Sequence, residues 1–142
     1  MSWCPKTTVV VPVDFSEESL AAVKTALTIA ASPDGVHVLH ILPELSPAEP
    51  ILLWEMYESA KRREAAAQEL EKRLTAAGIA GVQRHIFVGD PGQEIAAFAE
   101  RSHAELIVLP SHGRTGVRRL LIGSVAERVV RLAHCPVLVL RN

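Results

Sequence analysis

The stretch TTVVVPVDFSEESLAAVKTALTIAASPDGVHVLHIL, Thr7–Leu42, decides the fold class. It begins and ends with short runs, Thr7–Val13 and Val36–Leu42, that are nearly continuous in Val, Ile and Leu. Such runs are typical of strands that are buried on both faces. The segment between them, Ser16–Ala31, has a helical period and carries on one face Leu20, Val23, Leu27 and Ala30. The stretch therefore predicts a strand, a helix and a second, parallel strand.

The same alternation continues along the rest of the chain. Further strands are predicted at Val82–Val88, Glu105–Pro110 and Pro136–Arg141, and further helices at Leu52–Ala77, Pro91–His103 and Ser124–Ala133. The last helix has its apolar side chains at Val125, Val129, Val130 and Leu132. This order predicts an α/β fold: one open, parallel, five-stranded sheet with helices on both faces, Rossmann-like, in a single domain over residues 1–142. The polar run Val82–Val88 suits an edge strand.

The composition indicates a cytoplasmic protein that binds neither nucleic acid nor membrane. The 142-residue chain has a formal net charge of −1, so no general positive field favours either partner. No apolar run approaches the roughly 20 residues of a membrane-spanning helix, and the first residues lack a signal-peptide pattern. The charge is uneven, however, because residues 113–142 contain six arginines and one glutamate. An anionic ligand is therefore expected to meet the C-terminal third.

In open α/β sheets, ligands bind outside the carboxyl ends of the strands, where the strand order reverses. This rule selects Asp14 and Phe15 after the first strand, Ile41 after the second, and the segment from Pro110 onward after the fourth. Asp14 has two interpretations. Its carboxylate can accept hydrogen bonds from a ligand, or it can be a turn residue that helps to start a helix with Ser16 as the N-cap.

The segment LPSHGRTGVRRLLIGSVAERVV, Leu109–Val130, combines glycines, arginines and a helix start. Gly113 and Gly116 permit a tight loop whose amides can bind an anion. Ser124 and Glu127 fit a capping box, which would explain Ser124 without any ligand. A helix N-terminus is also an anion site, and Gly123 before it leaves room for a phosphate to approach. The segment is therefore either a phosphate cradle or a connector between a strand and a helix.

Several established chemistries do not fit the sequence. It has neither the Walker pattern nor G-x-G-x-x-G after the first strand, which disfavours a P-loop NTPase and a standard dinucleotide dehydrogenase. Ser111 and His112 are adjacent, so their side chains are expected to point in different directions, and no catalytic constellation is identified. At most we expect a slow ATPase. The two cysteines, Cys4 and Cys135, and the scattered histidines match no metal-site spacing.

Five stretches together resemble the universal stress protein family, from one end of the chain to the other. They are VVVPVDFSEES at Val9–Ser19, VHVLHIL at Val36–Leu42, VGDPGQEI at Val88–Ile95, SHGRTGVRRLLIGSVAERVV at Ser111–Val130, and CPVLVL at Cys135–Leu140. Nucleotide-binding members carry a loop G-x-x-G-x9-G-[ST]. Here Gly113 is followed by nine residues and then by Gly123 and Ser124.

The resemblance implies a sheet of strand order 3-2-1-4-5 and a homodimer formed by pairing of the last strand, Val137–Leu140. It implies an ATP-binding stress-response module that acts through nucleotide-dependent protein interactions. Adenine would lie near Pro12, Val13, Asp14 and the backbone of Ile41. Ribose and phosphates, with Mg²⁺ or Mn²⁺, would lie along Leu109, Pro110, Gly113, Gly123, Ser124 and Val125. Apart from the resemblance, Arg114, Arg118 or Arg119 is expected to add positive charge near the phosphates.

One position departs from the family pattern, because Pro110 replaces the first glycine of the loop. Proline has no amide hydrogen to donate to a ribose or phosphate, and its ring occupies space that glycine leaves open. We expect nucleotide binding to be weakened rather than abolished. The alternative is a dimeric interaction protein of the same fold that binds no nucleotide.

Overall fold

The strands form one parallel sheet. In the computed structural model, which describes residues 3–44, 52–112 and 122–141, the strands are hydrogen-bonded in the order β3-β2-β1-β4-β5. Their bounds are Val9–Pro12 for β1, Val36–Leu42 for β2, Gln83–Val88 for β3, Leu106–Pro110 for β4 and Val137–Leu140 for β5. Each neighbouring pair is parallel. The predicted fold class and strand order are confirmed, and the polar β3 lies at an edge.

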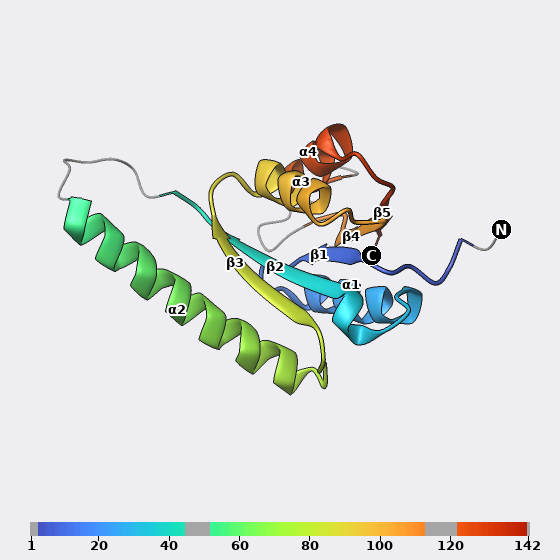
Figure 1. The fold of residues 1–142 in the computed structure, drawn as a ribbon, viewed down its shortest axis with the longest axis horizontal. Coiled ribbons are helices and arrows are strands. Elements are labelled where there is room, and N and C mark those ends of the chain that lie inside the picture. The colour runs from blue at the N-terminus through green and yellow to red at the C-terminus, as the bar shows by residue number, and fades with distance from the viewer. Residues whose placement is uncertain (1–2, 45–51, 113–121, 142) are drawn as a thin grey trace.

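The helices cover both faces of the sheet, as Figure 1 shows. Their bounds are Glu17–Ile29 for α1, Leu52–Ala76 for α2, Pro91–Arg101 for α3 and Ser124–Leu132 for α4, and a short 3-10 turn, Pro33–Gly35, precedes β2. α1 and α2 pack on one face, and α3 and α4 pack on the other. Right-handed crossovers require this division, because the chain moves outward from β1 to β3 and then returns past β1 to β4.

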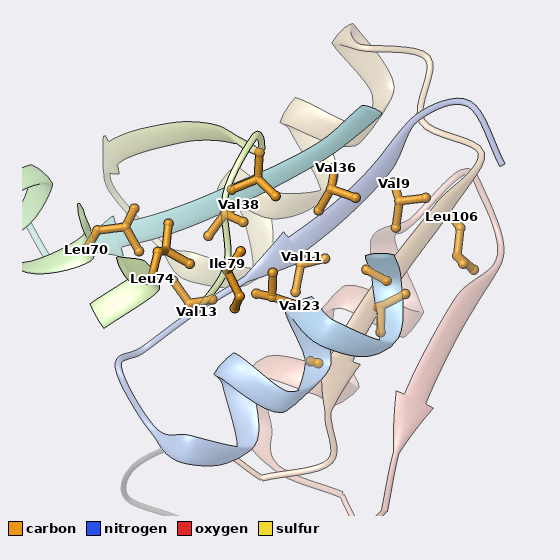
Figure 2. Packing of buried hydrophobic residues seen from close by; sticks show 14 residues of the cluster. Val9, Val11, Val13, Val23, Val36, Val38, Leu70, Leu74, Ile79 and Leu106 are labelled. Atoms are coloured by element: carbon orange, nitrogen blue, oxygen red, sulfur yellow. The ribbon is translucent and has the colours of Figure 1, made fainter. Parts of the chain in front are cut away.

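β1 lies between two hydrophobic clusters, which explains its unbroken run of valines. Val9, Val11 and Val13 belong to the cluster packed under α1 and α2, which Figure 2 shows with Val23 from α1. Val10 points to the opposite face, toward the cluster under α3 and α4. Successive side chains of a strand alternate between faces, so a strand covered on both sides needs apolar residues at every position.

Two helices begin at side-chain caps, one of which the sequence predicts. The Ser16 side chain accepts a hydrogen bond from the Ser19 amide at 3.1 Å, which confirms Ser16 as the N-cap of α1. The Asp90 carboxylate accepts one from the Gln93 amide at 3.0 Å, and Pro91 is the first residue of α3. Both caps follow strands, so they lie at the carboxyl edge of the sheet, where the predicted site also lies.

The apolar residues of α4 are only partly buried. Ala126 and Val129 are buried, whereas Val125, Val130 and Leu132 are 39%, 49% and 36% exposed. Only part of the apolar surface of this helix therefore faces the core. α4 is short and lies over the edge strand β5, whose residues are themselves only partly buried.

Candidate functional site

β1 and β4 separate near their carboxyl ends. β1 pairs with β2 at every position from Val9 to Pro12, but it pairs with β4 only at Val9 and Val10. These two strands flank the point at which the strand order reverses. Ligands of open α/β sheets bind in the crevice at this point. The gap between the ends of β1 and β4 is therefore the candidate site.

Pro110, at the end of β4, directs its backbone into this gap. Ile107 and Ser111 donate their amides to β5, to the carbonyl oxygens of Pro136 at 3.0 Å and Leu140 at 2.8 Å. Successive residues of a strand direct their amide groups to opposite sides, so position 110 faces β1 instead. The amide hydrogen that proline lacks is thus one that would have pointed into the crevice.

Pro12, at the end of β1, directs its backbone into the same gap from the other side. The Val13 amide donates to the Leu39 carbonyl oxygen on β2 at 2.7 Å, so position 12 faces β4. Neither Pro12 nor Pro110 has an amide hydrogen, and a ladder between their strands cannot continue at these positions. The two prolines give a physical reason for the opening of the sheet here.

The backbone of β2 forms one wall of the crevice. The Leu39 carbonyl faces β1, and Ile41, two residues further along, faces the same way, beyond the end of β1. The Leu42 carbonyl accepts the Gly89 amide at 2.9 Å on the opposite side, as the alternation requires. Ile41 thus directs an amide and a carbonyl toward the crevice. Such a strand edge can donate to and accept from the hydrogen-bonding edge of a heterocycle.

Val13 is more enclosed than Ile41. Its side chain is 4% exposed, its amide is bonded to Leu39, and its carbonyl oxygen lies 2.8 Å from His40 Nδ1. The His40 ring stacks on Phe15 with centroids 4.2 Å apart. Phe15 has a φ of +68°, a strained conformation for an aromatic residue. Phe15 packs against the cluster under α1 and α2, so this stack lies on that side of the sheet.

Asp14 adopts the turn geometry that the sequence offered as one of its two interpretations. Its Oδ1 accepts the Ser16 amide at 3.0 Å, and its own amide lies 3.3 Å from Ser19 Oγ. The residue is half-buried at the end of β1. The carboxylate is thus held in a fixed orientation beside the crevice. The turn does not exclude its use by a ligand, because a carboxylate accepts more than one hydrogen bond.

The start of α4 is tied to the end of β4. The Gly123 amide donates to the Ser111 carbonyl oxygen at 2.5 Å. A Cβ on Gly123 would lie 2.9 Å from that same oxygen. The glycine therefore allows the protein's own backbone to approach closely. The neighbouring predicted residue, Leu109, is 2% exposed with its side chain in the core. Its backbone has the same orientation as those of Ile107 and Ser111 and therefore faces β5, so Leu109 lies beside the crevice without directing hydrogen-bonding groups into it.

Two expectations for this segment are wrong. Ser124 is the first residue of α4 rather than its cap: Gly123 is the N-cap, without a side-chain hydrogen bond, and Glu127 pairs with Arg131 at 2.5 Å. The predicted capping box is therefore not formed. Ser111 Oγ and His112 Nδ1 lie 3.2 Å apart, so adjacency in sequence did not separate them. Ser111 is only 3% exposed, so its hydroxyl is poorly placed to attack a substrate.

The remaining predicted residues divide into two groups. Ser124 and Val125 are exposed in the first turn of α4, close to the end of β4. Gly113 and Arg114, together with Gly116, Arg118 and Arg119, lie outside the described residues. The described part of the site is therefore the strand ends of β1, β2 and β4 and the N-terminus of α4.

The structure adds residues that the sequence argument missed. A groove of about 370 Å³ lies between the first turns of α3 and α4, and its lining includes Asp90, Gly92, Ser124, Arg128 and Arg131. Asp90 and Gly92 belong to VGDPGQEI, where the Asp-Pro pair is a helix-start signal. That signal predicts the start of α3, but only the packing of α3 against α4 brings this turn beside Ser124.

The described residues contain neither a cluster of metal-binding side chains nor a helix suited to span a membrane. Over residues 3–44, 52–112 and 122–141, no group of three or more His, Cys, Asp or Glu side chains is arranged to hold a metal ion. Among the helices of this part of the chain, none is long and apolar enough to cross a membrane.

Comparison with known proteins identifies the family. A model of the universal stress protein family matches residues 6–141. The universal stress protein MJ0531 of Methanocaldococcus jannaschii is 41% identical over 141 residues, which cover 94% of this chain and 81% of that protein.

Solved structures agree with this match. The universal stress protein UspA of Lactobacillus plantarum is 26% identical, with a TM-score of 0.77 and coverage of 95% of this chain and 97% of that one. A universal stress protein solved in complex with cAMP is 27% identical, with a TM-score of 0.62 and coverage of 96% and 97%. In sequence and in fold, the chain belongs to the universal stress protein family.

Proposed function

We propose that this protein binds an adenine nucleotide, ATP in particular, in the crevice between β1 and β4, and that the nucleotide controls its interactions with other proteins. The observation that carries the proposal is the opening of the sheet at its switch point, with the Ile41 backbone on one side and the start of α4 on the other. Support also comes from the related universal stress protein that binds cAMP.

The groups around the crevice suit the parts of a nucleotide. The backbone of Ile41, near Pro12, Val13 and Asp14, offers hydrogen-bonding groups to adenine. The first turn of α4 has no side-chain cap, so the amides around Ser124 and Val125 are suited to phosphate oxygens. Leu109, Pro110, Gly113, Arg114 and Gly123 complete the proposed site. A divalent ion, Mg²⁺ or Mn²⁺, would be held chiefly by the phosphates, since the described side chains form no metal cluster.

The proposed role is signalling rather than catalysis. A bound nucleotide would favour the conformation that binds it best and so change the surface that partner proteins meet. Hydrolysis, if it occurs, would be slow. We place this protein in the cytoplasm, with no nucleic-acid or membrane partner.

We also propose a homodimer formed through β5. Pro136 and Leu140 direct their carbonyls to β4, so Val139 directs its amide to the open edge of the sheet. Pairing with the β5 of a second copy would satisfy that edge. A Val139→Pro variant removes the outward amide, and we expect it to sediment as a monomer where the wild type sediments as a dimer. An unchanged sedimentation coefficient would contradict this interface.

The alternative function is a dimeric interaction protein without a nucleotide. Two observations favour it: Pro110 removes an amide from the crevice, and the Val13 carbonyl already has a partner in His40. Nucleotide that co-purifies with the protein, identified by mass, together with calorimetric titration with Mg-ATP, separates the two functions. ATP in the purified protein or a saturable heat of binding supports the proposal. Their joint absence supports the alternative.

A further inference from the structure

Arg128 of α4 lies against the first turn of α3. A Cβ built on Gly92 would lie 2.7 Å from both Cγ and Cδ of Arg128. The arginine side chain therefore passes directly over the bare Cα of Gly92, in a place that other residues at position 92 would obstruct. This close contact with Gly92 restrains the aliphatic part of the Arg128 side chain and so sets the direction in which its guanidinium group points.

The charged end of Arg128 pairs with Asp90. Arg128 Nε lies 3.0 Å from Asp90 Oδ2, the oxygen that also accepts the Gln93 amide at the cap of α3. The two side chains are 46% and 45% exposed. An ion pair exposed to this degree contributes little to stability. Its removal should therefore leave the fold intact.

The pair lies in the groove that contains Ser124. Asp90, Arg128 and Ser124 all line it, and Arg128 is one helical turn beyond Ser124 on α4. The groove also contains Glu127, which is neutralised by Arg131. Without Arg128, the Asp90 carboxylate would present an unbalanced negative charge to any anion bound at the start of α4.

We propose that Arg128 is a positioning residue for the phosphates of the bound nucleotide, because it neutralises and restrains the Asp90 carboxylate beside the N-terminus of α4. This inference rests on the proposed nucleotide function. Arg128 acts through Asp90 and need not touch the ligand. Asp90 has two roles, because its carboxylate caps the N-terminus of α3 and pairs with Arg128 of α4.

The test is a charge-compensation cycle measured with two ligands. Arg128→Met keeps most of the aliphatic chain over Gly92 and removes the charge, whereas Asp90→Asn retains an acceptor for the Gln93 amide. We expect Arg128→Met to weaken Mg-ATP binding by about three- to tenfold at low salt and the effect to shrink as salt is raised. Addition of Asp90→Asn should restore most of the affinity. Binding of uncharged adenosine should be unchanged in all variants.

Gly92→Ala provides a second route to the same perturbation. Its methyl group should displace the Arg128 side chain and weaken ATP binding without removing a charge. Arg84→Met is the matched control, because Arg84 forms a comparably exposed pair with Glu71 at the far edge of the sheet. It changes the net charge equally, and we expect no more than a small effect on ATP affinity.

The possible results separate this inference from the proposed function. Equal ATP affinity in wild type and Arg128→Met would overturn the role of Arg128 and leave nucleotide binding intact. A double variant as weak as Arg128→Met would also overturn it, as would an equal loss of adenosine binding. Absence of ATP binding by the wild type at millimolar concentration, and by Pro110→Gly as well, would overturn the proposed function and this inference together.

Discussion

Replacement of Pro110 by glycine should strengthen nucleotide binding. The backbone at position 110 faces the crevice, because Ile107 and Ser111 on either side donate to β5. The substitution restores an amide hydrogen directed at the proposed ligand and removes ring atoms beside it. A hydrogen bond to a charged group contributes roughly 1.5–3 kcal/mol. The expected gain in affinity is therefore about tenfold to a hundredfold.

The same substitution should lower the stability of the free protein. Glycine has more conformational freedom than proline in the unfolded chain, which costs about 0.4–1 kcal/mol. Ligand-free Pro110→Gly should therefore melt at a lower temperature than the wild type. With saturating Mg-ATP the order can reverse, since a tenfold tighter ligand adds about 1.4 kcal/mol, or about 3–6 °C, to the ligand-induced shift.

Calorimetric titration with Mg-ATP is the direct assay, and Pro110→Ala is the matched variant. Alanine restores the amide hydrogen but keeps a Cβ, so it separates the hydrogen bond from the free space. A gain in both variants assigns the effect to the amide, and a gain in glycine alone assigns it to space or flexibility. If wild type and both variants bind with the same affinity, the assignment of position 110 to the ligand-facing side is refuted.

Further predictions concern the framework of the site. Gly123→Ala should destabilise the protein by about 1–3 kcal/mol, because its methyl group meets the Ser111 carbonyl oxygen; denaturant unfolding tests this, and an unchanged midpoint would contradict the close approach. Ser16→Ala should cost about 1 kcal/mol through loss of the α1 cap, measured the same way, and a value near zero would mean that the cap is replaced by another acceptor. His37 and His85 have ring nitrogens 3.0 Å apart, and burial lowers the pKa of both below 6.5, His37 further lowering the pKa of His85. The unfolded chain then binds more protons, so this pair should leave the free energy of unfolding unchanged well above pH 6.5 and lower it as the pH falls through 6.5 and below. His85→Phe should flatten this dependence in denaturant titrations between about pH 5 and 8, and an undiminished slope would assign it to other groups.

Much of the fold could be read from local patterns. The valine run of β1 predicts burial on both faces, the polar β3 predicts an edge, and Ser16 predicts a helix start. These signals are local, because burial of a strand on both faces, exposure of an edge strand and capping of a helix each restrict the residue types within one short segment. Position after a strand likewise predicts that Asp14, Ile41 and Pro110 meet at one edge of the sheet.

Other features depended on contacts between residues distant in sequence. The sequence suggests that Gly123 leaves room for a phosphate, yet the atom nearest to a Cβ at this position is the Ser111 carbonyl oxygen, twelve positions earlier. The capping box at Ser124 is not formed, because the N-cap position is taken by Gly123, whose amide is bonded to the Ser111 carbonyl oxygen at the end of β4.

What the sequence by itself determined is the order of elements, the sidedness of the strands and the edge at which a ligand would bind, because periodicity and chain order govern all three. Only the tertiary structure decided which groups share that edge. The packing of α3 on α4 joins Asp90 to Arg128, and the separation of β1 from β4 leaves two prolines directed into one gap. Both features arise where segments far apart in the chain pack together. The residue pattern of a single segment carries no information about such contacts.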